Sequence, residues 1–241
     1  MKAIAINASP HMDKGNTALI LTPFLGGFRE TGTEVEVFYT KKLQIKPCQG
    51  EFNCWLKTPG ECFLKDDMDM LLPKLAEAEI WVLATPVYYD GMTGTLKNLI
   101  ERCVPMLSPV LELRDGHCRF PVRESIKPGL IVLVASCGLW EMDNFDPLLA
   151  HMQALSRNVN RRFAGALLRP HATEIKSVLD MGMPVDDVLQ AAKEAGRQLV
   201  EKGEMSSQTL AAISRPLLPL EMYVQVRNQR FQQALAALSA A

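Results

Sequence analysis

The sequence lacks a strong charge of either sign. Of its 241 residues, 26 are lysine or arginine and 27 are aspartate or glutamate, so the formal net charge is −1. This balance gives no basic patch of the kind that binds nucleic acid or an anionic membrane surface. We therefore expect neither nucleic acid nor a membrane among its partners.

Long apolar runs are also missing, although apolar residues make up 48% of the chain. Proline, glycine or charge interrupts each run before about 18 residues, which is the least that a membrane span needs. The amino terminus enters a strand pattern at once, without the cleavage-site signature of a secretory signal. Six cysteines in such a chain fit a reducing compartment better than a disulfide scaffold. We expect a cytoplasmic protein.

Several catalytic and nucleotide-binding signatures are absent. The sequence has no G-x-G-x-x-G and no Walker lysine motif in its first polar loop, which argues against a dinucleotide Rossmann site and a nucleoside triphosphatase. Its four histidines are scattered, and none lies in a metal-binding pattern. We assign no catalytic acid or base.

The most informative stretch that is present lies at the amino terminus. Residues 2–8 form an apolar strand pattern, residues 9–15 a polar loop, and residues 16–31 a helix with Leu19, Phe24, Leu25 and Phe28 expected to face inward. A loop that leads into a helix offers free backbone N–H groups and the positive end of the helix dipole, and therefore suits an anion. The alternative is that Asn16 only caps a helix after an ordinary turn.

Apolar strand patterns and helical patterns alternate along the rest of the chain. Further strands are predicted at 33–39, 80–84, 130–135 and 162–168, and further helices at 66–78, 95–104, 145–159, 186–202 and 220–238. This alternation predicts an α/β fold with a parallel sheet covered by helices on both faces. Residues 1–204 form the predicted domain, with a hairpin-like insertion at about 105–128 around Asp115-Gly116, and residues 205–241 a helical extension.

Three polar loops follow the first, third and fourth strands, at residues 9–17, 85–94 and 136–140. In a five-stranded sheet of order 2-1-3-4-5 those strands are neighbours. Ligands of such sheets bind beyond the carboxyl ends of the strands, at the point where the strand order reverses. We therefore expect the three loops to form one site.

These loops also carry a family resemblance. It rests on Ser9-Pro10 with Asn16-Thr17, on the cysteine-containing stretch 47–62, on Asp66-Asp67-Met68, and on 85–97. With these motifs the chain resembles the flavodoxin-like NAD(P)H-dependent FMN reductases, in the branch of the iron–sulfur flavoproteins. The resemblance implies a flavodoxin-like three-layer sandwich, bound FMN, and electron transfer from NAD(P)H to a small acceptor.

The resemblance also implies roles for individual residues. The first loop would bind the FMN phosphate, the second would contact the ribityl chain and the ring, with a tyrosine stacked on it, and the third would border the ring. For the two tyrosines the alternative is that they only cover the end of the sheet. The implied FMN-binding residues are Ser9, His11, Asn16, Thr17, Pro86, Val87, Tyr88, Tyr89, Ser136, Cys137 and Gly138.

The cysteines depart from the pattern of that branch. Cys48, Cys54 and Cys62 fit three of its four cluster ligands, and Glu51 stands where the other cysteine is expected. A [4Fe–4S] cluster normally takes four thiolates. A cluster with Glu51 as a ligand and a zinc site remain alternatives, and we predict that these cysteines hold no metal.

Three functions follow from this reading. The first is an FMN reductase that passes electrons from NAD(P)H to a quinone, a nitroaromatic or free flavin, as a homodimer or homotetramer whose interface includes the insertion and the extension. The second is an FMN-binding electron carrier without nicotinamide activity, for which a net charge of −1 is unusually small. The third is a redox or metal sensor based on the three cysteines. We favour the first.

Overall fold

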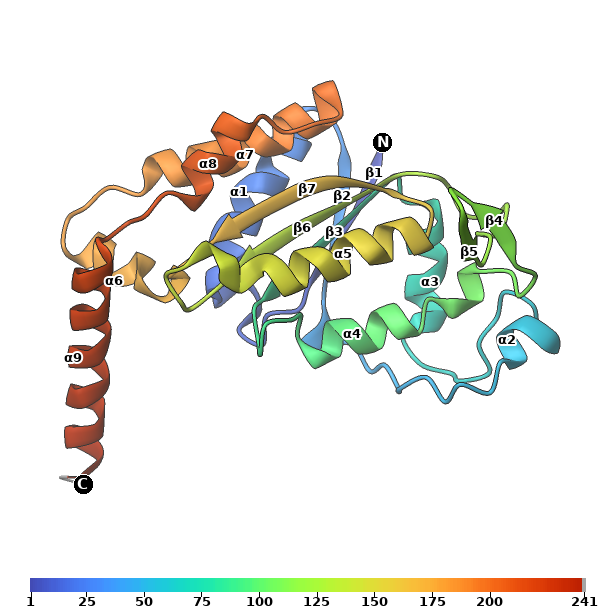
Figure 1. The fold of residues 1–241 in the computed structure, drawn as a ribbon, viewed down its shortest axis with the longest axis horizontal. Helices are drawn as coiled ribbons and strands as arrows, with labels where there is room; N and C mark the ends of the chain where they lie inside the picture. The colour runs from blue at the N-terminus through green and yellow to red at the C-terminus, as the bar shows by residue number, and fades with distance from the viewer. Residues whose placement is uncertain (240–241) are drawn as a thin grey trace.

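A computed structural model describes residues 1–239. It contains five parallel strands in the order β2-β1-β3-β6-β7, which confirms the predicted strand order (Figure 1). The strands are β1 (Lys2–Asn7), β2 (Glu34–Tyr39), β3 (Ile80–Pro86), β6 (Leu130–Ser136) and β7 (Arg162–Arg169). Their pairing is in register from Ala3↔Ile80 to Asn7↔Ala84 and from Ile80↔Leu130 to Pro86↔Ser136.

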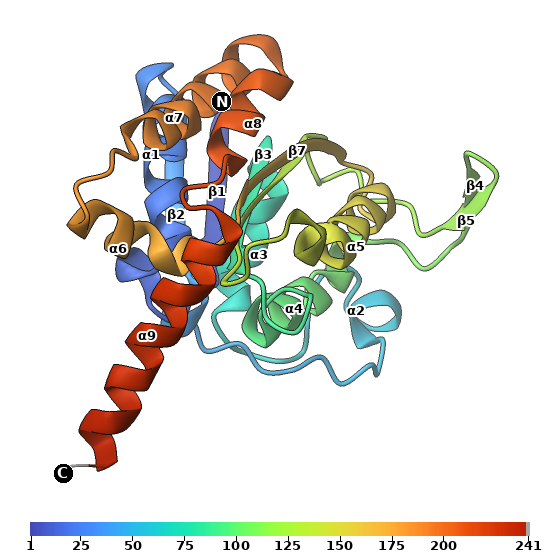
Figure 2. The same cartoon turned by 60° about the vertical axis from the view of Figure 1, so that its left-hand side comes forward.

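Helices cover both faces of this sheet, so the predicted three-layer arrangement is confirmed (Figure 2). One face packs against α1 (Asn16–Glu30), α6 (Ile175–Asp180), α7 (Asp186–Lys202) and α8 (Ser207–Ser214). The other packs against α3 (Met68–Glu77), α4 (Gly94–Glu101) and α5 (Asp146–Asn158). Successive residues of a strand pack against opposite helical layers: Ala3 and Ala5 face the first layer, whereas Ile4 and Ile6 face the second.

The insertion forms the predicted hairpin, with β4 (Glu112–Arg114) paired antiparallel to β5 (His117–Arg119) as a separate two-stranded sheet. Short elements that the sequence did not predict are α2 (Asn53–Leu56), α6 and α8. The last helix, α9 (Leu220–Ser239), extends away from the body (Figures 1 and 2). Within residues 1–239, none of the helices combines the length and the apolar character of a membrane span.

The segment after residue 204 shares the core of the first layer. Met205, Ile213 and Leu218 join the apolar cluster formed by α1, α7 and the sheet. The division into a domain at 1–204 and an extension at 205–241 remains a proposal, and residues 240–241 lie outside the described residues.

One detail of the sequence prediction was wrong. Leu19 is 39% exposed, and Ile20 and Leu21 are buried in its place, because the buried side of α1 follows positions 17, 20, 21, 24, 25 and 28. Helix α3 runs from Met68 to Glu77 with Pro73 inside it.

Helices α1 and α7 cross where two glycines meet. A Cβ atom on Gly196 would lie 2.1 Å from the carbonyl oxygen of Phe24, and one on Gly27 would lie 2.1 Å from that of Lys193. The two backbones therefore touch directly. This contact explains a glycine at position 27, which helix propensity alone disfavours.

Candidate functional site

The carboxyl ends of β1, β3 and β6 lie side by side, and the three predicted loops meet there (Figure 1). Buried hydroxyl groups join them. Thr17 Oγ1 and Ser136 Oγ are 2.8 Å apart, which links the first loop to the third. Thr93 Oγ1 donates to the carbonyl of Ala8 at 3.3 Å, which links the second to the first. The structure thus brings the predicted loops together.

The first loop ends at an uncapped helix. The side chain of Asn7 accepts from the Ser9 amide at 2.9 Å, and Ser9 Oγ accepts from the His11 amide at 3.3 Å. Within residues 1–239, no side chain caps the amino terminus of α1, and its first turn contains no acidic residue. The free amides of Asn16 and Thr17, together with the helix dipole, therefore form a site that suits an anion.

Gly15, the residue before α1, lies where the first loop comes closest to the amino terminus of that helix. A Cβ atom on Gly15 would lie 2.4 Å from Ser9 Oγ and 3.2 Å from the Cβ of His11. A side chain at this position would displace Ser9 Oγ from the His11 amide and press on the Cβ of His11, so glycine allows the loop to fold closely over the helix terminus. The loop is thus a cradle formed by backbone, with Ser9 and Thr17 buried beneath it.

The second loop presents two aromatic rings. The amide of Val87 donates to the carbonyl of Ser136 at 2.8 Å, and Tyr88 pairs with Gly91 through two backbone hydrogen bonds. Tyr89 and Asp90 form the tip, with φ of 45° and 62°. Tyr88 is half exposed and Tyr89 is fully exposed. Tyr89 therefore does not cover the end of the sheet, and its ring is free to meet a planar ligand.

The third loop is anchored by the buried side chain of Cys137 and by a hydrogen bond from helix α9. Cys137 is buried, and burial raises the pKa of its thiol, which suits a packed, protonated side chain. The carbonyl of Gly138 accepts a 2.7 Å hydrogen bond from the Tyr223 hydroxyl, at the start of α9. Tyr223 was not predicted from the sequence, since no local pattern links residues so far apart in the chain.

The three cysteines of the stretch 47–62 line one small cavity. Cys48, Cys54, Cys62 and Glu51 surround a volume of about 40 Å³, together with the buried Arg102. Burial raises the pKa of Cys54, and the nearby Glu51 and the two other thiols raise it further. Glu51 accepts a 3.1 Å hydrogen bond from the amide of Asn53 at the start of α2.

This donor set does not fit a four-thiolate cluster. It offers three thiols, and the carboxylate in the remaining position is already engaged with α2. Within the described chain, no group of three His, Cys, Asp or Glu side chains is arranged to hold a metal ion. Protein contacts order the stretch instead: Trp55 donates to the carbonyl of Val104 at 3.2 Å, and Arg102 donates to Cys62 Sγ at 3.4 Å.

Arg102 also forms a buried ion pair with Asp66. The shortest contact, from Arg102 Nη1 to Asp66 Oδ2, is 2.6 Å, and the two side chains are 1% and 3% exposed. Burial opposes ionisation of Asp66, but the hydrogen bonds from Arg102 and from the amides of Lys46 and Met68 outweigh it and lower its pKa. Asp66 thus does more than start helix α3, which was its predicted role.

Replacing Asp66 by asparagine is expected to destabilise the protein by roughly 3–5 kcal/mol at pH 7, because Arg102 would remain buried and uncompensated. Since the folded-state pKa of Asp66 is lowered, its contribution is present above about pH 4 and is lost as the pH falls through the lowered value. Urea unfolding of both proteins at pH 7 and below pH 4 measures this difference, which should narrow in acid. Asp69→Asn, which removes an exposed pair with Lys65, is the control and should cost less than about 1 kcal/mol.

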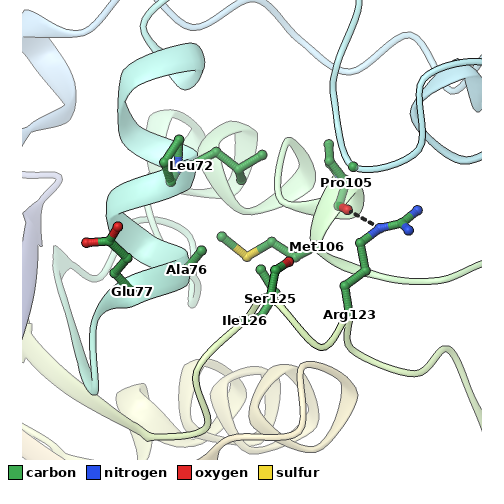
Figure 3. A pocket seen from close by; sticks show the side chains of 10 residues that line it. Leu72, Ala76, Glu77, Pro105, Met106, Arg123, Ser125 and Ile126 are labelled. Atoms are coloured by element: carbon green, nitrogen blue, oxygen red, sulfur yellow. Dashed lines mark hydrogen bonds between the residues drawn. The ribbon is translucent and has the colours of Figure 1, made fainter.

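A further hollow of about 310 Å³ lies between α3 and the insertion (Figure 3). Leu72, Ala76, Met106 and Ile126 form its apolar lining, and Arg123 joins the two ends of the insertion by donating to the carbonyl of Pro105 at 2.9 Å. Ala76 lies near the end of α3 that leads into the amino end of β3. This hollow is therefore separate from the loops at the carboxyl ends of the strands.

Comparison with known proteins agrees with this geometry. The sequence model of the NADPH-dependent FMN reductase family matches residues 1–154. An iron–sulfur flavoprotein of Archaeoglobus fulgidus is 39% identical over 102 residues, which cover 42% of this chain and 48% of that protein. One of Methanocaldococcus jannaschii is 37% identical over 106 residues, which cover 44% and 53%. The chain thus matches about half the length of these relatives.

Solved structures show the same fold. An NAD(P)H:quinone oxidoreductase from Methanothermobacter marburgensis superimposes with a TM-score of 0.57 at 17% identity, over 83% of this chain and 96% of that one. At this identity the likeness concerns the fold alone.

Proposed function

Because the chain belongs to the NADPH-dependent FMN reductase family, we propose that it binds FMN and passes electrons from NAD(P)H to a small acceptor such as a quinone, a nitroaromatic or free flavin. The observation that carries the proposal is the uncapped amino terminus of α1 beneath the cradle at Gly15, at the switch point of the sheet.

The residues present fit FMN. The amides at Asn16 and Thr17, with Ser9 and His11 beside them, would hold its phosphate, and neutral donors suffice because the helix dipole favours the anion. Pro86, Val87, Tyr88 and Tyr89 would border the ring on one side, and Ser136, Cys137 and Gly138 on the other. Bound FMN supplies hydride and single-electron transfer, while the protein binds the flavin and restricts access of water. We therefore assign no catalytic acid or base.

An absorption spectrum of the protein purified without oxygen tests this function. Flavin bands that bleach when NADPH or NADH is added are the expected result. Flavin bands that persist with both nucleotides would favour the electron carrier. A protein that stays colourless after incubation with FMN would contradict the proposal. Replacement of Cys48, Cys54 and Cys62 by serine should leave the flavin bands unchanged, and loss of a redox response in that variant would favour the sensor.

The missing fourth thiol at the cysteine cavity leads to a prediction for Glu51→Cys, which is expected to gain iron. Glu51→Cys supplies a fourth thiol at the cavity of Cys48, Cys54 and Cys62, so after anaerobic reconstitution it is expected to retain about four irons per chain, as one [4Fe–4S] cluster does. The wild-type chain should retain almost none. Iron and sulfide analysis with electron paramagnetic resonance measures both.

A matched control for this variant is Glu61→Cys, which also adds one thiol to the same stretch but at a position that does not line the cavity. It should bind no more iron than the wild type. A wild-type chain that already holds a stoichiometric cluster would show that Glu51 or another group replaces the missing thiolate.

We also propose that the protein is a cytoplasmic homodimer or homotetramer. Two elements outside the three-layer body expose apolar side chains. On the insertion these are Val110, Leu111 and Leu113, and on α9 they include Phe231 and Leu235. A hairpin of two short strands is marginal on its own. Sedimentation of the active enzyme tests this, and a fully active monomer would contradict it.

A further inference from the structure

Helix α9 is attached to the body only through its first turns. Of the described residues 220–239, Tyr223 alone is buried. Beyond its bond to Gly138, α9 is held by Arg227, which donates to Thr173 Oγ1 at 2.8 Å, and by ion pairs of Arg227 and Arg230 with the fully buried Glu174 at 3.4 and 3.8 Å. The remainder projects from the molecule (Figures 1 and 2).

The projecting part carries an apolar stripe. Val224, Phe231, Leu235 and Leu238 are between 43% and 75% exposed. Their spacing of seven, four and three residues places them within roughly 60° of arc on an α-helix. The attachment residues Tyr223, Arg227 and Arg230 lie to one side of this arc. The guanidinium groups of Arg227 and Arg230 approach the ring of Phe231 from that side, at 5.3 and 6.0 Å from its centre, and the stripe stays exposed on its other side.

A projecting helix with an exposed apolar stripe gains stability when another surface packs against it. Isolated helices of this length are marginal in water, since most helical stability in proteins comes from packing of an apolar face. The last residues, 231–239, include glutamine and serine but no charged side chain that could form stabilising pairs along the helix. Packing against another apolar surface would therefore stabilise α9 through the stripe.

Three of the four stripe residues are complementary to themselves. Val224 and Leu238 each lie seven residues from Phe231, so an antiparallel copy centred on Phe231 brings Val224 of one chain to Leu238 of the other, as a two-fold axis requires. Leu235 then lies opposite Arg227 of the other copy, at the edge of this seam. The charged residues of α9 (Glu221, Arg227 and Arg230) all precede Phe231. In an antiparallel pair the charged half of one α9 packs against the uncharged half of the other. In a parallel pair each arginine would lie beside the same arginine of the other copy.

We propose that α9 pairs antiparallel with α9 of a second copy of this chain, with Phe231 on the axis, and that this pairing fixes the third loop of the flavin site. The second part rests on the proposed function. The link runs through residues 217–223: Tyr223 bonds to Gly138, Trp140 Nε1 donates to the carbonyl of Leu218 at 2.9 Å, and the Leu217 amide donates to His171 Nε2 at 2.9 Å. The His171 amide in turn donates to the carbonyl of Leu139 at 2.6 Å.

Light scattering after size exclusion tests the pairing. Leu238→Asp places a charge opposite Val224 of the other copy, within the apolar seam, and its molar mass is expected to be half that of the wild type. Gln233→Asp makes the same charge change on the opposite side of α9 and should leave the mass unchanged. A monomeric wild type, including one that instead needs a different protein as its partner, or a Leu238→Asp variant of unchanged mass, would overturn the pairing.

Disulfide trapping tests the direction. In a chain whose exposed Cys48 and Cys118 are replaced by serine, a mixture of Val224→Cys and Leu238→Cys chains treated with diamide, which accepts the two thiol hydrogens, should form a disulfide between the two kinds of chain. Val224→Cys alone should remain reduced. A disulfide between two Val224→Cys chains would overturn the antiparallel arrangement.

The link to the flavin is tested with Tyr223→Phe, which removes only the hydroxyl group. We expect unchanged molar mass, about tenfold weaker FMN binding, and a shifted midpoint potential of the bound flavin. Leu238→Asp, which separates the two copies, should weaken FMN binding as well. Wild-type affinity and potential in Tyr223→Phe would overturn the link. If the wild type binds no FMN, the proposed function fails, whereas the molar masses still decide the pairing.

Discussion

The Gly15→Ala variant is expected to bind FMN roughly 100-fold more weakly than the wild type, a loss of roughly 2.7 kcal/mol. The added methyl group would meet Ser9 Oγ at 2.4 Å and the Cβ of His11 at 3.2 Å, so the Ser9 side chain must rotate away from the His11 amide and the loop must shift at His11. Backbone amides bind a phosphate only where they converge on it, and a displaced loop loses that convergence. Fluorescence titration of the apoprotein with FMN measures the change.

The control for this variant is Gly26→Ala, which adds the same methyl group to α1 where nothing lies within 4 Å. It should bind FMN as the wild type does and should be more stable by about 0.5–1 kcal/mol, as expected for alanine in place of glycine inside a helix. Wild-type FMN affinity in Gly15→Ala would show that the phosphate, and with it the flavin, binds elsewhere.

The second large expected effect is a loss of thermal stability in the Gly196→Ala variant. Gly196→Ala would drive a methyl group to 2.1 Å from the carbonyl oxygen of Phe24, where backbone rather than a flexible side chain must give way. We expect α7 to shift from α1 at a cost of roughly 3 kcal/mol. In a chain of this size that loss lowers the melting temperature by roughly 6–12 °C.

Thermal unfolding followed by circular dichroism, with Gly26→Ala as the reference, measures this cost. A melting temperature of Gly196→Ala equal to that of the wild type would mean that the two helices cross less closely than the structure shows. FMN affinity in Gly196→Ala should fall far less than in Gly15→Ala, because the crossing lies on the helical layer and not at the three loops.

The sheet and the site loops were predictable because their signals are local. Each buried strand is a short apolar run, and each site loop directly follows one, so the topology brings the loops together without further information. The start of α1 at Asn16 and the extent of α7 from Asp186 to Lys202 were predicted for the same reason. Their polar and apolar residues repeat with the period of a helix.

Contacts between distant residues were not predictable in this way. Asp66 carries the pattern of a helix start, and its partner Arg102 lies 36 residues further on with nothing to mark it as buried. Tyr223 resembles any residue of an amphipathic helix, yet it reaches Gly138 across 85 residues. Gly27 and Gly196 each look unfavourable within a helix, and only their meeting explains both.

The contact between His171 and Leu217 has a consequence for the order of synthesis. Loop 136–140 is made well before the residues that hold it in place, since the contacts from Leu218 and Tyr223 come from 78 and 85 positions further along the chain. A nascent chain on the ribosome can therefore form β1, β3 and β6 while this loop is still unsupported. The loop adopts its final form only after residues 217–223 have been made, and products that terminate before Leu217 never complete it.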